Sequence, residues 1–172
     1  MWGLMGKEIG LRRAGADDIP FIMRTERLEG YSDMVGCWDE DRHRAAFADP
    51  HCAYFVAGTS ERLVGFALLT GWDAADRVTL IKRVAVTEPG KGYGKALVRA
   101  VADAAFSETG VWRLWIDCFT HNTRARRAYE AVGFLAEGIA RGGAFFRGEN
   151  RDVLILAQLR SDWEARRIAL PS

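Results

Sequence analysis

The stretch Val84-Ala-Val-Thr-Glu-Pro-Gly-Lys-Gly-Tyr-Gly-Lys-Ala-Leu-Val98 decides the fold of this chain. Its apolar start closes a β-strand expected over 78–86, and residues 95–107 have the apolar spacing of an amphipathic helix. A further apolar segment, 111–119, is expected to be a strand. Strand, helix and strand in this order predict a βαβ unit whose two strands are parallel and joined by a right-handed crossover.

The segments on either side of this unit predict a mixed sheet. No linker, repeat or low-complexity tract divides the sequence, so residues 1–172 are expected to form a single domain. The fold class is α/β in the broad sense (α+β), with a mostly antiparallel central sheet, one parallel βαβ unit and about four flanking helices. The other strands are expected at 9–14, 53–57, 63–69, 134–140 and 152–159, and the other helices at 17–28, 38–47 and 122–132, the last ending at Gly133. Residues 141–151 are expected to connect the last two strands with a turn near Gly148-Glu149-Asn150, and a short amphipathic tail follows.

The composition excludes several classes of protein. The chain has 24 Lys plus Arg and 23 Asp plus Glu in 172 residues, a net charge of +1, and 49% hydrophobic residues. This balance excludes a disordered chain and argues against nucleic acid as a partner, which would require a large basic excess. Three widely spaced cysteines without His at ligand spacing predict no metal site and a reducing, cytoplasmic location. No signal peptide or apolar run of about 20 residues is found, so no membrane association is expected.

The glycine-rich loop between strand and helix is a candidate anion cradle. Backbone N–H groups at a helix N-terminus lack intrahelical partners, and Gly90, Gly92 and Gly94 let a ligand approach them closely. Lys91 and Lys95 add positive charge. The loop does not have the spacing of a Walker phosphate loop. A dinucleotide-binding site remains an alternative, because Asp117 follows on the next strand where a ribose-binding acid would lie.

The order of three motifs resembles that of the GCN5-related N-acetyltransferases. Pro89-Gly-Lys-Gly-Tyr-Gly94 is similar to the pyrophosphate loop of that family, except that proline stands at its first position. Asn122-x-x-Ala125-x-x-x-Tyr129-x-x-x-Gly133-Phe134 is similar to the second motif, and Val84-Ala-Val86 resembles the strand that pairs with pantetheine. The end of the chain is most similar to the branch with ribosomal-protein, phosphinothricin-type and spermidine acetyltransferases.

This resemblance implies an N-acetyltransferase that moves an acetyl group from acetyl-CoA to a primary amine by direct attack in a ternary complex. The amine would belong to a small molecule or a peptide N-terminus, and a homodimer is an expectation of the same kind. The alternatives are a dinucleotide-binding enzyme of other chemistry and a CoA-binding sensor without turnover. The resemblance assigns cofactor binding to Val84, Ala85, Val86, Gly90, Lys91, Gly92, Tyr93, Gly94, Lys95, Asn122 and Arg126.

Two residues are the candidates for proton transfer. The resemblance implies that Tyr129 donates a proton to the departing thiolate. Asp117 is the candidate base, because an amine must lose its proton before it attacks; a competing role is an ion pair with Arg113. Cys118 faces the opposite side of its strand and is expected to be a core thiol.

The resemblance implies that the acceptor pocket lies between the loop that follows the first helix and the late hairpin. Acidic side chains there would attract a cationic amine, and aromatic side chains would hold its apolar part. The histidines form no triad and no metal-like set. The candidate acceptor residues are Glu26, Glu29, Tyr31, Asp33 and Phe146.

Overall fold

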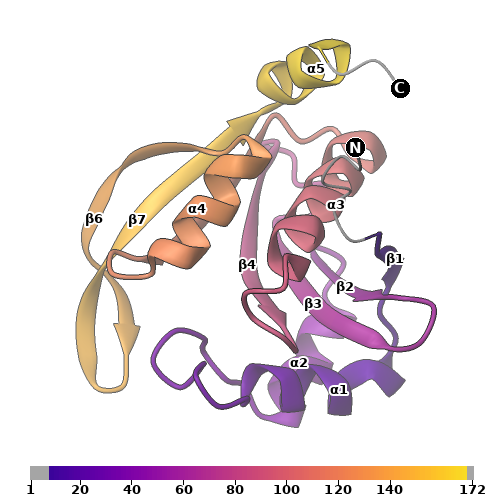
Figure 1. The fold of residues 1–172 in the computed structure, drawn as a ribbon, viewed down its shortest axis with the longest axis vertical. Coiled ribbons are helices and arrows are strands. Elements are labelled where there is room, and N and C mark those ends of the chain that lie inside the picture. The colour runs from indigo at the N-terminus through magenta and orange to yellow at the C-terminus, as the bar shows by residue number, and fades with distance from the viewer. Residues whose placement is uncertain (1–7, 170–172) are drawn as a thin grey trace, which may run out of the picture.

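A seven-stranded sheet with the order β1-β2-β3-β4-β5-β7-β6 forms the centre of the computed structural model, which describes residues 8–169 (Figure 1). Every neighbouring pair is antiparallel except β4 and β5, which are parallel and joined through α3. The predicted βαβ unit and the mixed sheet are therefore confirmed. The strands are β1 (Gly10–Arg13), β2 (Cys52–Gly58), β3 (Leu63–Thr70), β4 (Val78–Val86), β5 (Arg113–Phe119), β6 (Leu135–Phe146) and β7 (Glu149–Leu159).

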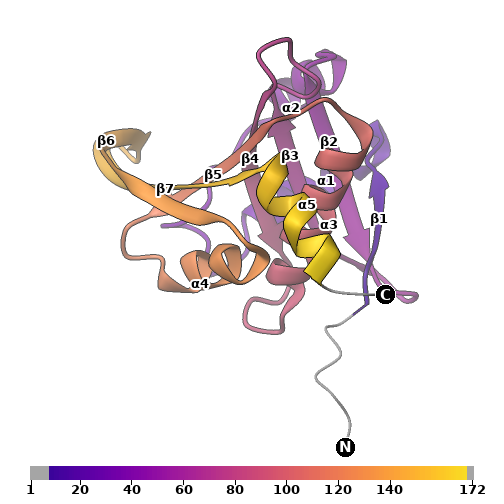
Figure 2. The same cartoon turned by 90° about the horizontal axis from the view of Figure 1, so that it is seen from above.

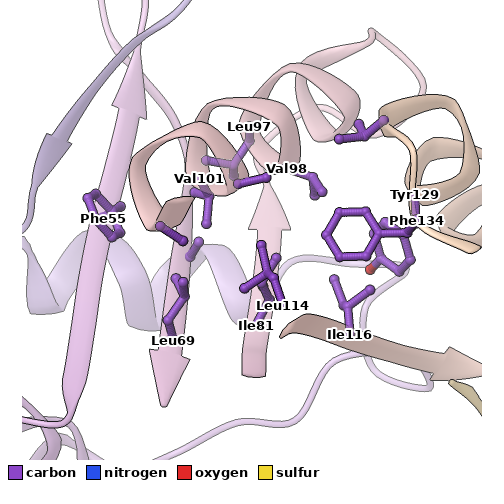
Figure 3. Close-up of a cluster of buried hydrophobic side chains, with 14 of the residues drawn as sticks. Phe55, Leu69, Ile81, Leu97, Val98, Val101, Leu114, Ile116, Tyr129 and Phe134 are labelled. Atoms are coloured by element: carbon purple, nitrogen blue, oxygen red, sulfur yellow. The ribbon is translucent and has the colours of Figure 1, made fainter. Parts of the chain in front are cut away.

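Helices cover both faces of the sheet (Figure 2). One face packs against α3 and α4, and its core includes Leu97, Val101 and Leu114, each fully buried (Figure 3). The other face packs against α1 and α2 through a second cluster that contains Ile22 and Phe66. The helices are α1 (Ile19–Glu26), α2 (Glu40–Ala48), α3 (Tyr93–Glu108), α4 (Thr123–Val132) and α5 (Arg160–Ala169).

The parallel strands β4 and β5 stay paired over only three residues of each. The ladder joins Val78 to Arg113, Thr79 to Leu114 and Leu80 to Trp115, and then it stops, although β4 continues to Val86 and β5 to Phe119. The second half of β4 therefore has no strand partner on its β5 side. The two strands separate there and open the middle of the sheet.

The hairpin of β6 and β7 is longer than expected. The strands were expected to end at 140 and begin again at 152, and these bounds were wrong: both strands run through most of 141–151 and meet at a two-residue turn, beside the turn expected near Gly148. Arg147 and Gly148 both have positive φ (51° and 81°), as a turn between twisted antiparallel strands requires. Register shifts between Ala140 and Ala144 absorb the glycines as bulges, so they do not end the strand.

The remaining helices differ from the expectation in detail. A short 3-10 turn (Ala16–Asp18) precedes α1, and the expected tail is a full helix, α5, so the described part of the chain has five α-helices. The α5 helix packs on α3: the Trp163 indole nitrogen donates to Asp103 at 2.7 Å, and its ring stacks on Phe106. Between residues 8 and 169, no helix is both long and apolar enough to span a bilayer.

Candidate active site

A cleft of about 990 Å³ occupies the opening between β4 and β5. Its walls come from the loop after α1, the second half of β4, the glycine-rich loop, the end of β5, the start of α4 and the turn of the β6–β7 hairpin. Figure 1 shows the loop after α1 and the hairpin turn on the same side of the molecule. An ion pair between Asp33 and Arg147 at 2.8 Å joins them across the cleft entrance. The cleft thus brings segments from most of the chain together.

The glycine-rich loop forms the end of the cleft at the N-terminus of α3. Gly90 and Gly92 have φ of +81° and +86°, which other residues adopt only with strain, and Gly92 is the N-cap of α3. A Cβ added to Gly90, Gly92 or Gly94 would meet nothing within 4 Å, so the loop leaves open space for a group that approaches its backbone. Lys95 lines the cleft, whereas Lys91 is exposed outside it and the Tyr93 side chain is buried in the core.

The free edge of β4 lines the cleft beside this loop. The Val86 N–H donates to the Tyr31 hydroxyl at 3.1 Å, and that hydroxyl donates to the Val86 carbonyl at 2.7 Å. Both polar groups of Val86 therefore point away from β3. Because these directions alternate along a strand, Val84 presents its polar groups to the cleft as well, and Ala85 uses its own to pair with Phe66 of β3.

The start of α4 forms the side of the cleft that faces the glycine-rich loop and β4. The Asn122 side chain accepts a hydrogen bond from the Ala125 N–H at 3.1 Å, so it caps the helix, and it also lines the cleft. Arg124 lines the cleft as well. Arg126 does not: it forms an ion pair with Glu130 one turn further along α4 at 2.9 Å. Arg124 thus lines the cleft, whereas Arg126, the residue expected from the sequence, does not.

Tyr129 reaches the cleft from the buried face of α4. Only 7% of the residue is exposed, and its ring packs beside Phe134 and extends towards Ile116 (Figure 3). Its hydroxyl forms no hydrogen bond with another group of residues 8–169, although the residue lines the cleft. Burial raises the pKa of the phenol, so it holds its proton at neutral pH. A buried phenol that faces a cleft without a protein partner is suited to donate a proton there.

Asp117 lines the cleft from β5. The competing ion pair with Arg113 does not form, because Arg113 binds Glu137 with two contacts of 2.6 Å. No hydrogen bond or ion pair joins the Asp117 carboxylate to the described residues. Removal from water raises its pKa, and the nearby charge of Lys82 opposes this rise. Cys118, the next residue, is buried as expected, and burial raises the pKa of its thiol to about 11.

Glu26 is not free to meet a substrate, although the sequence made it a candidate. Its side chain is fully buried, and its two oxygens accept hydrogen bonds from the Trp38 N–H at 3.0 Å and from Arg83 at 2.9 Å. Arg27 also donates to it, and His43 lies 3.1 Å away. The carboxylate therefore anchors α1, the following loop, α2 and β4 to one another.

The other acceptor candidates divide into two groups. Glu29, Tyr31 and Phe146 line the cleft, whereas Asp33 is taken up by its ion pair with Arg147 and does not line it. Sequence reasoning missed several residues of the same wall because each comes from a segment without a motif. These are Trp38, Arg42, Arg83, Phe119 and His121, of which the last two stack with their ring planes 3° apart.

The comparison with known families agrees with this geometry. The model of the acetyltransferase (GNAT) family matches residues 22–134, which span α1 to the end of α4. The chain belongs to this family. The resemblance that the sequence motifs predicted is thereby confirmed.

Two relatives of known name match parts of this family member. YdaF of Bacillus subtilis (strain 168), named as a ribosomal N-acetyltransferase, is 33% identical over 78 residues, which cover 45% of this chain and 43% of YdaF. The match thus spans less than half of that protein's length. Streptothricin acetyltransferase of Streptomyces lavendulae is 31% identical over 135 residues, or 78% of this chain and 67% of the relative.

Solved structures of spermidine N-acetyltransferase SpeG from Vibrio cholerae share the fold. A SpeG point mutant superposes with a TM-score of 0.79 at 21% identity, covering 92% of this chain and 97% of SpeG. The structure of SpeG in complex with manganese ions gives a TM-score of 0.76 at 21% identity, covering 92% and 96%. At this identity, the likeness confirms the predicted fold class alone.

Proposed function

We propose that this acetyltransferase-family protein transfers the acetyl group of acetyl-CoA to a primary amine of a small molecule or a peptide N-terminus. The observation that carries the proposal is the cleft itself. It brings the N-terminus of α3, the free edge of β4 and the unpartnered groups of Tyr129 and Asp117 into one space. The relatives named for ribosomal-protein, streptothricin and spermidine acetylation support an amine as the acceptor.

The residues present fit acetyl-CoA. The open backbone of Gly90–Gly94 at a helix N-terminus suits a pyrophosphate, and Lys95 and Arg124 add charge on either side. Lys91 would act only through its long-range charge. The outward-facing polar groups of Val84 suit an amide of the pantetheine arm, and Asn122 lies at the facing helix end. When bound, the cosubstrate supplies a thioester as the acyl donor.

Asp117 and Tyr129 would each carry out one proton transfer. Asp117, directly or through water, accepts the proton of the ammonium group, so that the neutral nitrogen can attack the thioester carbon, and the nitrogen loses its second proton to water as the carbon–sulfur bond breaks. Tyr129 donates its proton to the sulfur as the carbon–sulfur bond breaks. Burial raises its pKa, so the hydroxyl is protonated before the thiolate forms. No cysteine is needed, since the Cys118 thiol is buried and protonated.

Free-thiol release from acetyl-CoA across a panel of primary amines tests this function. We expect amine-dependent release and a decrease of kcat by about 10²-fold or more in Tyr129→Phe, the usual size of a positioned proton transfer. Tyr54→Phe is the control, because Tyr54 is a buried tyrosine that hydrogen-bonds His43 and does not line the cleft.

The two alternatives predict other results. A CoA-binding sensor would bind CoA but release no thiol with any amine. A dinucleotide-binding enzyme would bind NAD tightly and show no response to CoA in the same titration. A cytoplasmic location and a homodimer remain predictions; the free thiols of Cys37, Cys52 and Cys118 support the former.

A further inference from the structure

The part of the cleft away from the glycine-rich loop carries more cations than carboxylates. Eight side chains with a full charge line the cleft, and two of them, Lys95 and Arg124, lie at the starts of α3 and α4. We call the remaining part the acceptor side. Its six charged residues are Glu29, Arg42, Lys82, Arg83, Asp117 and Arg147, so four cations face two carboxylates.

Two of these four cations are paired with carboxylates that do not line the cleft, so the unpaired charges of the acceptor side are Arg42 and Lys82 against Glu29 and Asp117. Glu26 is fully buried, forms ion pairs with Arg83 and Arg27, and accepts a hydrogen bond from the Trp38 N–H. Asp33 is paired with Arg147. Glu26 and Asp33 are therefore each paired with an arginine, whereas Glu29 lines the cleft and forms no ion pair with a described residue.

Arg42 and Arg83 lie against the same aromatic ring in the cleft wall. Their guanidinium carbons lie 4.2 Å and 4.7 Å from the centre of the Trp38 ring. Arg83 is committed to Glu26, but Arg42 forms no ion pair with any residue of the described chain. Stacking on the indole holds the plane of the Arg42 guanidinium and leaves its N–H edge able to donate, which is the arrangement that binds a carboxylate with two hydrogen bonds.

Lys82 places a second unpaired cation beside the candidate base. It lines the cleft at the bulge of β4, forms no ion pair within residues 8–169, and its charge acts on Asp117. Asp117 can receive one ammonium group. A second ammonium group on the same ligand would lie near Lys82, Arg42 or the ion pair of Arg83 with Glu26, and the cations would repel it. An anionic group in the same place would be attracted.

We propose that the acceptor is a primary amine that also carries an anionic group, of the carboxylate type, which Arg42 and Lys82 bind while the amine faces Asp117. A polycation is the class of amine that this arrangement disfavours. The inference rests on the proposed function, because it names the class of the acceptor in the same cleft.

Matched pairs of acceptors test the inference. Free α-, β- and γ-amino acids are compared with their own carboxamides and with spermidine, and kcat/KM is measured by thiol release from acetyl-CoA. At least one amino acid should exceed both its carboxamide and spermidine by tenfold or more. The carboxamide of an α-amino acid has the more easily deprotonated amine, so its intrinsic reactivity works against the expected result.

Variants then assign the preference to residues. In Arg42→Gln, kcat/KM for the amino acid should fall about tenfold or more, mainly through KM, and kcat/KM for the carboxamide should change less than threefold. In Lys82→Gln, kcat/KM should fall more for the amino acid than for the carboxamide, and both should fall because the lost charge also acts on Asp117. Arg44→Gln is the matched control, since Arg44 lies on the same helix, pairs with Glu40 and does not line the cleft. Calorimetric binding of CoA should remain the same in all three variants.

Three outcomes would overturn the inference. Spermidine or the carboxamides could be acetylated as efficiently as the amino acids, or Arg42→Gln could affect both members of a pair equally, or Arg44→Gln could reproduce its effect. If CoA binds but no amine causes thiol release, the proposed function itself fails, and the inference fails with it. If spermidine is acetylated and the amino acids are not, the proposed function stands and only the inference is rejected.

Discussion

Replacing Glu26 by Ala should destabilise the fold more than any other loss of a single surface or cleft charge. The side chain has 0% exposure and accepts hydrogen bonds at both oxygens, from Arg83 at 2.9 Å and from the Trp38 N–H at 3.0 Å. His43, which is equally buried, lies 3.1 Å from the same carboxylate. The change leaves the Arg83 guanidinium, whose side chain is only 8% exposed, without its counter-charge.

The size of the effect follows from this burial. Removing one partner of a buried ion pair costs about 3–5 kcal/mol, because the other charge stays in a poorly solvated place. The exposed ion pair of Glu40 and Arg44 is the matched control: its contact is 2.6 Å, but both side chains are more than half exposed. Such a pair contributes about 0–1 kcal/mol, so Glu40→Ala should be close to neutral.

Thermal and urea unfolding of both variants measure the difference. For a domain of this size, each kcal/mol changes Tm by about 2–4 °C, so Glu26→Ala should lower Tm by roughly 6–20 °C and Glu40→Ala by less than 4 °C. Glu26→Gln keeps the shape of the side chain and should fall between them. If Glu26→Ala unfolds within 2 °C of Glu40→Ala, the assignment of Glu26 as the anchor between α1, α2 and β4 is incorrect.

Three further predictions concern the cleft and its support. Asp117 must be ionised to act as a base, and its pKa is raised. As the pH is lowered, kcat/KM should therefore begin to fall at a higher pH than it would with an ordinary carboxylate as the base. The pH profile of Asp117→Asn should lack this acid-side fall, and a fall that persists would belong to another group. Tyr31→Phe frees both polar groups of Val86. Calorimetry should then show CoA binding more tightly by about 5- to 150-fold, because two hydrogen bonds of about 0.5–1.5 kcal/mol each sum to about 1–3 kcal/mol; weaker binding would show that Tyr31 supports the site and does not compete for it. Gly133→Ala should lower the unfolding free energy by about 1–3 kcal/mol, because a side chain is strained at its φ of +115°, whereas the guanidinium of Arg166 near the new Cβ can move away. Gly110→Ala, whose Cβ would meet nothing within 4 Å, is the control, and equal losses would contradict the argument.

The local features of this fold follow from the sequence alone. The helix over Tyr93–Glu108, the strand over Val78–Val86 and the end of α4 at Gly133 all depend on residues within a few positions of one another. Apolar spacing selects helix or strand, and only glycine readily adopts the backbone angle of +115° at that helix end. The parallel βαβ unit follows in turn, since the connection through a helix leaves few other arrangements. For the same reason the glycine-rich loop could be placed at a helix N-terminus.

Only the tertiary structure decided which side chains share the cleft. Arg124 and Arg126 are two residues apart on α4, so they lie on different sides of the helix. Which of these sides faces the cleft depends on how α4 packs on the rest of the chain. Tyr31 and Val86 are 55 residues apart, and their contact depends on where β4 leaves β5. Glu26 looked like an exposed acid near an acceptor, but the packing of α1, α2 and β4 buried it against Arg83. Local periodicity determines which elements form, whereas the charges that remain unpaired in the cleft depend on how distant elements pack. This packing pairs two of the expected acidic residues with arginines and places Arg42 and Lys82 beside Glu29 and Asp117.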